Sequence, residues 1–201
     1  MAVKSSFKNM TICLFAICLV CSALLAGVYA LTAEPIAAAA AAKNEAAIKQ
    51  VLPETAVTIE EESSIVVDGQ TYTYNRAFDN LGNTVGCAIN VSANGFGGPI
   101  VIKVGFGVDG VIWNTKVLSQ AETPGLGAKC VEPSFSDQFK GFNPAEKKLA
   151  VKKDNGDVDA ITASTITSRA YANGLAAAAK VFGEIVGTPM PLDGWTGATA
   201  N

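Results

Sequence analysis

Two short segments of the sequence carry residue types that suit a phosphorylated ligand. The first, residues 122–127, reads Glu-Thr-Pro-Gly-Leu-Gly, in which the proline and two glycines fix a tight turn and let backbone amides approach a ligand closely. The second, residues 159–165, leads into a predicted helix, and five hydroxyl side chains lie within the seven residues from Thr162 to Ser168. Amides without partners and the dipole at a helix N-terminus favour an anion such as phosphate, so this segment predicts an anion site.

Both segments also have a plain structural interpretation. A Pro-Gly turn between two elements would look like the first segment, and a hydroxyl is the ordinary N-cap of a helix. Capping accounts for one or two hydroxyls but gives no reason for so dense a cluster. The sequence contains no histidine, which removes Ser/His and Cys/His nucleophilic pairs and the commonest metal ligand. Any chemistry must therefore come largely from a cofactor.

The composition excludes several classes of partner and site. A formal net charge of −3 and the absence of a Lys/Arg cluster leave no basic field for nucleic acid. Cys13, Cys18 and Cys21 lie in an apolar N-terminal run, Cys87 and Cys130 are far apart, and none has metal-ligand spacing. The last two could form a disulfide if exported, but buried free thiols are the simpler expectation.

An uncharged apolar run over residues 11–31 is long enough to cross a membrane as a helix. Lys4 and Lys8 precede it and Glu34 is the first charge after it, so the positive-inside rule predicts a cytoplasmic N-terminus and a soluble domain on the outer face. A signal peptide cleaved after Val28-Tyr29-Ala30 is the alternative, although the run is longer than usual for one.

The remaining pattern predicts an α+β fold. An alanine-rich stretch entered at Pro35 and stopped by Pro53 predicts a helical stalk over Pro35–Leu52. Strand-like runs separated by turn signals predict a meandering antiparallel sheet, and apolar periodicity predicts a helix over Ile166–Val186 that packs on it. The expected strands are residues 57–68, 70–78, 84–93, 100–109 and 111–118.

On these motifs, and over nearly its whole length, the chain resembles the FMN-binding family that contains the G subunit of the Rnf electron-transport complex and the C subunit of the sodium-translocating NADH:quinone reductase. The match to the Glu-Thr-Pro-Gly-Leu-Gly loop is complete. In that family a threonine ending an Asp-x-x-Ser/Thr-Gly-Ala-Thr pattern is esterified to the FMN phosphate. Thr165 occupies that place and Asp159 begins the pattern, whereas Ala163 stands where glycine is usual and Ser164 where alanine is usual.

The resemblance implies an electron-carrier subunit with FMN on Thr165, within a membrane complex that couples electron transfer between ferredoxin and NAD to ion translocation. It implies a relay rather than a catalyst, without catalytic or metal-ligating residues, and its partners are the other subunits of an Rnf-type complex and a flavin transferase. Further contacts to the cofactor are expected from Glu122, Thr123, Gly125, Leu126, Gly127, Thr162, Ser164 and Thr167. The implied organisation is a cytoplasmic N-terminus (1–10), a transmembrane anchor in the cytoplasmic membrane (11–31), a stalk (32–53), an FMN-binding domain (54–187) and a C-terminal tail (188–201).

Three points stay open at this level. Asp193–Thr199 fits the attachment pattern more literally than the inner copy, but no helix follows Thr199, so Thr165 is preferred. Trp113 and Trp195 could line the flavin ring, although an aromatic in a strand is more often part of a core. The alternative function is an exported, membrane-anchored binding or structural module without a flavin, in which both loops are only turns and caps.

Overall fold

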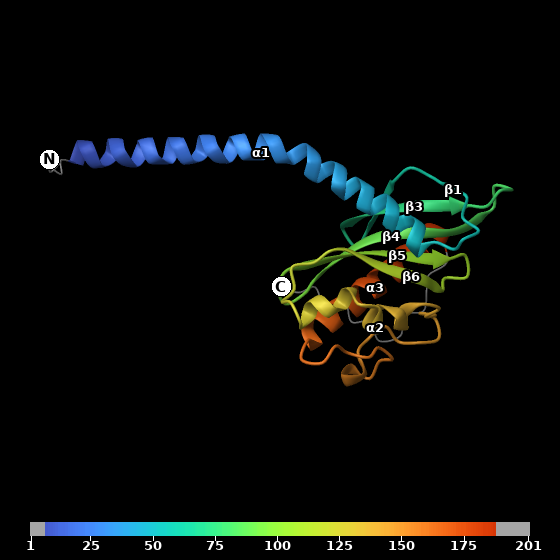
Figure 1. Cartoon of the computed structure of the whole chain (residues 1–201). Coiled ribbons are helices and arrows are strands. Elements are labelled where there is room, and N and C mark those ends of the chain that lie inside the picture. The colour runs from blue at the N-terminus through green and yellow to red at the C-terminus, as the bar shows by residue number, and fades with distance from the viewer. Residues whose placement is uncertain (1–6, 188–201) are drawn as a thin grey trace. The chain divides into compact units, whose positions relative to one another are not determined.

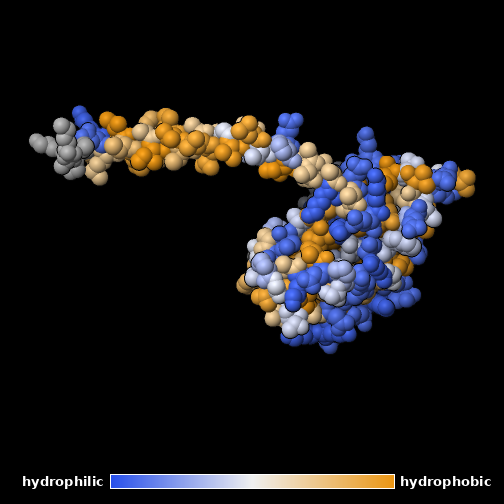
Figure 2. All heavy atoms as spheres, viewed as in Figure 1, coloured by the Kyte–Doolittle hydropathy of each residue, from blue (hydrophilic) through white to orange (hydrophobic). Residues whose placement is uncertain are grey.

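The computed structural model describes residues 7–187, which divide into an N-terminal unit up to Lys43 and a larger unit from Asn44 onward. Helix α1, Phe7–Val51, begins in the first unit and ends in the second (Figure 1). Its N-terminal part is exposed, and the face seen in Figure 2 is mostly apolar, as expected for a helix surrounded by lipid. It is the one helix in the described part of the chain that is long and apolar enough to cross a membrane.

Helix α1 differs from the sequence-based expectation at Pro35. A separate stalk helix was expected to begin at this proline, but Pro35 lies inside one continuous helix. A proline removes one intrahelical hydrogen bond, and the alanine-rich sequence that follows has the highest helix propensity, so the helix continues. The expected end is confirmed, because α1 stops at Val51, two residues before Pro53.

The described residues form one antiparallel sheet, as the sequence predicted, with six strands where five were expected. They are β1 (Thr58–Ile59), β2 (Ser63–Val67), β3 (Gln70–Phe78), β4 (Thr84–Asn94), β5 (Pro99–Gly107) and β6 (Ile112–Ser119). The order is β1-β3-β4-β5-β6, and β2 pairs with β3 on the same side as β1. Strands β1 and β2 therefore form one edge of the sheet and β6 forms the other.

The first edge differs in one respect from the expected single strand over residues 57–68. It is split between β1 and β2 by Glu60, Glu61 and Glu62, three adjacent residues of low strand propensity. The turn that follows is confirmed: Asp68 and Gly69 have φ of 52° and 76°, the left-handed pair that a two-residue hairpin turn requires.

The sheet has different layers on its two faces. Helix α3, Thr165–Val186, packs across β4 and β5, where Ile100, Ile102 and Phe106 are fully buried. On the opposite face the last turns of α1 pack through Ile48 and Val51. Gly105 permits this contact, because a Cβ there would overlap the Val51 carbonyl oxygen.

Short helices connect the sheet to α3. They are the 3-10 helix η1 (Gly127–Val131), α2 (Pro133–Ser136), and the 3-10 helices η2 (Asp137–Phe139) and η3 (Lys152–Asp154). Phe135 and Phe139 pack their rings against the ring of Tyr171 from α3, which fixes this segment on the domain. Between β6 and α3 the described chain thus forms only short helices.

Two expectations about side chains have clear outcomes. Cys87 and Cys130 are free, buried thiols, and burial raises their pKa to about 12 and about 11, respectively. The simpler expectation for these cysteines is confirmed. Trp113, expected in the core, is 51% exposed, and Trp195 lies outside the described residues.

Candidate functional site

The two segments singled out in the sequence meet at the buried side chain of Glu122. Its Oε2 accepts a hydrogen bond from Thr167 Oγ1 at 2.6 Å, which joins the first loop to the start of α3. Its Oε1 accepts a hydrogen bond from the Gly97 amide at 3.0 Å. Gly97 belongs to the turn between β4 and β5, so a third segment enters the site. We call Glu122, Thr167 and Gly97 the Glu122 hub.

Glycines around the hub are required by close packing. A Cβ at Gly127 would overlap Glu122 Oε2 and lie 2.7 Å from Thr167 Oγ1, and a Cβ at Gly95 would overlap Glu122 Oε1. Gly125 has a φ of 77°, in the left-handed region that favours glycine. The glycines of the first motif therefore let the loop turn and let its backbone pass beside the carboxylate.

The start of α3 leaves several backbone amides without partners inside the helix. The first helical hydrogen bond is donated by the Ser168 amide to the Ser164 carbonyl at 3.0 Å, so the amides of Thr165, Ile166 and Thr167 precede it. Ser164 is the residue at the cap position, yet its side chain makes no capping hydrogen bond. This end of α3 therefore has the amides and dipole that attract an anion.

The hydroxyl cluster separates into two groups. Thr167 donates to Glu122, and Ser168 Oγ accepts from the Ile161 amide and donates to the Ser164 carbonyl, both at 2.9 Å. Within residues 7–187, the hydroxyls of Thr162, Ser164 and Thr165 make no hydrogen bond. Two hydroxyls thus have structural roles other than N-capping, and the other three have no hydrogen-bond partner among the described residues.

Ala163 adopts a backbone conformation that usually belongs to glycine. Its φ is 61°, and an alanine in the left-handed region is less favourable than glycine by about 1 kcal/mol. This is the position where the sequence departs from the attachment pattern by replacing glycine with alanine. At this position glycine would adopt the observed backbone conformation more readily than alanine does.

The charged groups beside the start of α3 are already paired. Lys152 Nζ lies 2.7 Å from Asp159 Oδ1, and the backbone of Asp159 is held by two hydrogen bonds with the Gln138 amide group. Arg169 donates two hydrogen bonds to Asp154, at 2.6 and 2.7 Å, which lower the pKa of the Asp154 carboxyl. An anion bound at this end of α3 would rely mainly on backbone amides.

Exposed apolar side chains occur in each of the three segments that meet at the hub. Phe96, Leu126 and Ile166 are 72%, 43% and 52% exposed, and each is adjacent in sequence to a residue at or against the hub. We call these three residues the apolar rim. Exposed apolar groups gathered from separate segments are typical of a surface that binds an apolar ligand or partner. Leu126 was expected from the sequence, but Phe96 and Ile166 were missed. The signal available for Phe96 was an aromatic residue between two glycines in a hairpin turn.

The remaining site residues from the sequence lie in the same loops without joining the hub. Thr123 is exposed, and its carbonyl accepts hydrogen bonds from the amides of Leu126 and Ala128. Thr162 is exposed, Thr165 is half-buried and Ser164 is buried. The described residues contain no group of three acidic, Cys or His side chains that could hold a metal ion.

Comparisons with known proteins match both parts of the chain. A family model described as FMN-binding domain matches residues 95–180, and one described as RnfG N-terminal region matches residues 1–51. The G subunit of the ion-translocating oxidoreductase complex of Methanosarcina acetivorans is 33% identical over 159 residues, which cover 78% of this chain and 84% of that protein. The chain belongs to the family of G subunits of ion-translocating oxidoreductase complexes. This confirms the resemblance drawn from the motifs.

Several other similar proteins cover less of the chain. The G subunit of the Na⁺-translocating ferredoxin:NAD⁺ oxidoreductase complex of Acetobacterium woodii is 34% identical over 106 residues, which are about half of each protein. The chain spans about half the length of this and several other curated G subunits that it matches. Among solved structures, the C subunit of the Na⁺-translocating NADH-quinone reductase of Parabacteroides distasonis is 23% identical with a TM-score of 0.44, covering 63% of this chain and 74% of that one.

The FMN-binding match begins at Gly95 and ends inside α3, so it encloses all three segments that meet at Glu122. The chemistry of the site fits an FMN, because it combines free helix-start amides for a phosphate with an apolar rim for a ring system. FMN is therefore the cofactor that this G-subunit domain supports.

Proposed function

We propose that the chain is the FMN-carrying electron relay of a membrane complex that couples electron transfer between ferredoxin and NAD to ion translocation. The G-subunit family and the FMN-binding match support the relay, and the name of the Acetobacterium woodii relative supports ferredoxin and NAD as the redox partners. The other subunits of such a complex are the partners. A bound flavin supplies the capacity to accept and release electrons, and the protein supplies its position and surroundings.

We further propose that FMN is bonded through its phosphate to Thr165 Oγ. The observation that carries this is the half-buried Thr165 hydroxyl, which is unbonded at an uncapped helix start, while its neighbours Thr167 and Ser168 are engaged by the protein. The amides of Thr165 to Thr167 stabilise the negative charge of the phosphate. A phosphoester at this position would be bonded to the Thr165 oxygen, and its negative charge would lie next to the helix-start amides.

The remaining residues of the site hold this arrangement in place. Glu122 accepts hydrogen bonds with both carboxylate oxygens, so its role is to tie three segments together. Phe96, Leu126 and Ile166 are the exposed apolar side chains that would hold the ring, and by reducing its contact with water they would influence the flavin potential. Thr123, Gly125 and Thr162 belong to the loops that form the mouth of the site.

A covalent attachment suits a domain that stands in an open aqueous compartment. We propose that the domain stands on the outer face of the cytoplasmic membrane, which the charge bias around the apolar part of α1 supports. A cofactor that is bonded to the chain cannot dissociate there, whatever the external FMN concentration. The bond requires a flavin transferase, which is therefore a maturation partner.

The test is covalent flavin in Thr165→Ala, compared with Thr162→Ala as a matched control. Both threonines belong to the same loop and have unbonded hydroxyls, but only Thr165 opens the helix. We expect flavin fluorescence in the denatured protein band from wild type and Thr162→Ala, and none from Thr165→Ala, when each is produced with the transferase.

A Thr199→Ala variant addresses the tail pattern, which lies outside the described residues. Fluorescence that persists in Thr165→Ala and disappears in Thr199→Ala would move the attachment to the tail. Wild-type protein without bonded flavin would contradict covalent attachment, and protein that also binds no free FMN would favour a module without a flavin.

A further inference from the structure

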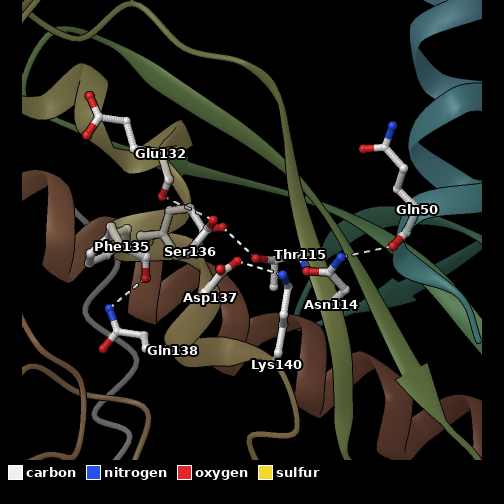
Figure 3. Close-up of polar contacts among 10 residues, drawn as sticks. Gln50, Asn114, Thr115, Glu132, Phe135, Ser136, Asp137, Gln138 and Lys140 are labelled. Atoms are coloured by element: carbon white, nitrogen blue, oxygen red, sulfur yellow. Dashed lines mark hydrogen bonds and ion pairs between the residues drawn. The ribbon is translucent and has the colours of Figure 1, made fainter.

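Strand β6 forms an edge of the sheet, and a polar groove runs along it. The groove has a volume of about 230 Å³ and lies between residues 114–117 of β6 and the segment from Cys130 to Lys140. Figure 3 shows this region, with Thr115 of β6 facing Asp137 and Lys140. At one end, Asn114 Nδ2 donates to the Gln50 carbonyl of α1 at 2.9 Å.

The backbone of β6 directs hydrogen-bonding groups into this groove. The Thr115 amide donates to the Asn114 side chain at 2.9 Å, so it points away from β5. Pairing with β5 continues without a bulge from Thr115 through Lys116 to Val117, and backbone direction alternates along a strand. Val117 therefore directs both its amide and its carbonyl away from β5, and within residues 7–187 neither is bonded to another backbone group outside the sheet.

Side chains around the groove are polar and carry a positive excess. Lys116 and Lys140 line it together with one acid, Asp137, which lies 2.7 Å from Lys140 Nζ. Its inner wall contains the hydrogen-bonded hydroxyls of Thr115 and Tyr171, 2.8 Å apart. The space is smaller than a usual small-molecule pocket and suits one or two side chains of an extended peptide.

We propose that the β6 groove binds an extended, acidic segment of a neighbouring subunit, which adds to the sheet as a strand. The Val117 amide and carbonyl and the Thr115 carbonyl supply the main-chain hydrogen bonds, because the Thr115 amide already donates to Asn114. Lys116 attracts the carboxylates of the segment, since Lys140 is already paired with Asp137. This rests on the proposed place of the chain in a complex. It does not require a flavin, because the groove is separate from the Glu122 hub.

Proline substitution tests the main-chain contact. Val117→Pro removes the outward amide without removing a hydrogen bond to β5, although it also replaces a side chain that is buried in the core. Val66→Pro is the control on the other edge: Val67 and Gln70 flank a two-residue turn and exchange hydrogen bonds, so the Val66 amide also points outward. Because the Val66 side chain is exposed, the unfolding midpoints of both variants are measured alongside, and only folded protein is compared.

The measurement is co-purification of the other subunits with the tagged full-length chain, expressed with its native complex. We expect Val117→Pro to lower their yield about tenfold relative to Val66→Pro, the effect of one lost hydrogen bond and a steric clash. Amide deuterium uptake of β6 should be slower in the complex than in the isolated chain, with no such change for β2. Equal yields for the two variants, or unchanged uptake of β6, would overturn the proposal.

A double charge reversal, Lys116→Glu with Lys140→Glu, leaves the backbone unchanged. It tests the β6 groove if Val117→Pro does not fold. It should lower the yield of the other subunits, and a yield equal to wild type would overturn the acidic partner. Flavin fluorescence read from the same samples separates this proposal from the flavin assignment. If the variants carry bonded flavin and still bind the other subunits as wild type does, the proposal for the β6 groove is refuted and the flavin assignment is unaffected.

Discussion

Two ionisable side chains are buried on opposite faces of the sheet, and the protein treats them differently. Glu122, on the α3 side, accepts hydrogen bonds with both oxygens and connects three segments of the chain. Lys103, on the α1 side, is fully buried and donates one hydrogen bond, 3.2 Å long, to the neutral Asn75 side chain. A buried charge is stabilising only where its hydrogen-bonding capacity is met. Glu122 therefore holds three segments of the chain together, whereas the cost of burying the Lys103 ammonium group is offset by only one hydrogen bond.

Removal of the Glu122 side chain should change the free energy of unfolding more than any other substitution considered below. Glu122→Ala leaves the Thr167 hydroxyl and the Gly97 amide without their acceptor, so we expect a loss of about 3 kcal/mol in the free energy of unfolding. Glu122→Gln keeps one acceptor oxygen and should cost about half as much. Urea unfolding of the detergent-solubilised chain measures both, and an unchanged midpoint for Glu122→Ala would show that the hub does not organise the site.

Lys103 should make stability depend on pH in the alkaline range. Burial lowers its pKa from 10.5 to about 8, although the Glu62 carboxylate opposes the shift. The unfolded chain then binds more protons than the folded one between these values, so this residue makes stability rise as pH increases from about 8 to 10.5. We expect a gain of about 2 kcal/mol for wild type relative to Lys103→Met, whose residue 103 does not titrate. Parallel pH profiles for the two proteins would contradict this account of Lys103.

Ala163→Gly should give a smaller effect of opposite sign to the loss at Glu122. Glycine adopts the left-handed conformation of residue 163 without the Cβ penalty, so stability should rise by about 0.5 to 1 kcal/mol. Covalent flavin should be at least as high as in wild type, because the substitution restores the glycine of the attachment pattern. The unfolding midpoint and in-gel flavin fluorescence measure the two effects. A lower midpoint would mean that the Ala163 methyl group stabilises the loop by more than its backbone conformation costs.

The exposed pair of Arg169 and Asp154 should show the smallest effect. Although its geometry is bidentate, both side chains are accessible to water, where ion pairs contribute little. Asp154→Asn should leave the unfolding midpoint and the flavin content unchanged within error. A clear loss of flavin would instead show that Asp154 positions the start of α3 through Arg169.

The order of strands and the main helices could be predicted from sequence because their signals are local. Turn dipeptides such as Asp68-Gly69 and the apolar periodicity of α3 each depend on a few neighbouring residues. Pro35 was misjudged because its local cost is outweighed by the helix propensity around it. The exposure of Trp113 depends on which face of β6 the fold covers, and the sequence pattern does not contain this information.

The site was only partly predictable for the same reason. The loop before η1 and the start of α3 have recognisable compositions, so both were found. Their contact through Glu122 and Thr167 is a long-range pairing of residues 45 positions apart, which no local pattern encodes. The turn containing Gly97 escaped notice because its role arises only once the Glu122 carboxylate lies beside it.

The interruption of the first sheet edge by three glutamates has a consequence for self-association. Open-ended stacking of sheets needs two adhesive edges on each molecule, whereas β1 and β2 are short and separated by negative charge. Only β6 remains as a long edge within the described sheet, and two copies that meet through it leave no further edge of this kind exposed. Within the residues that the structure describes, this chain therefore lacks the second long edge through which sheets of successive copies would have to join to grow into a fibre.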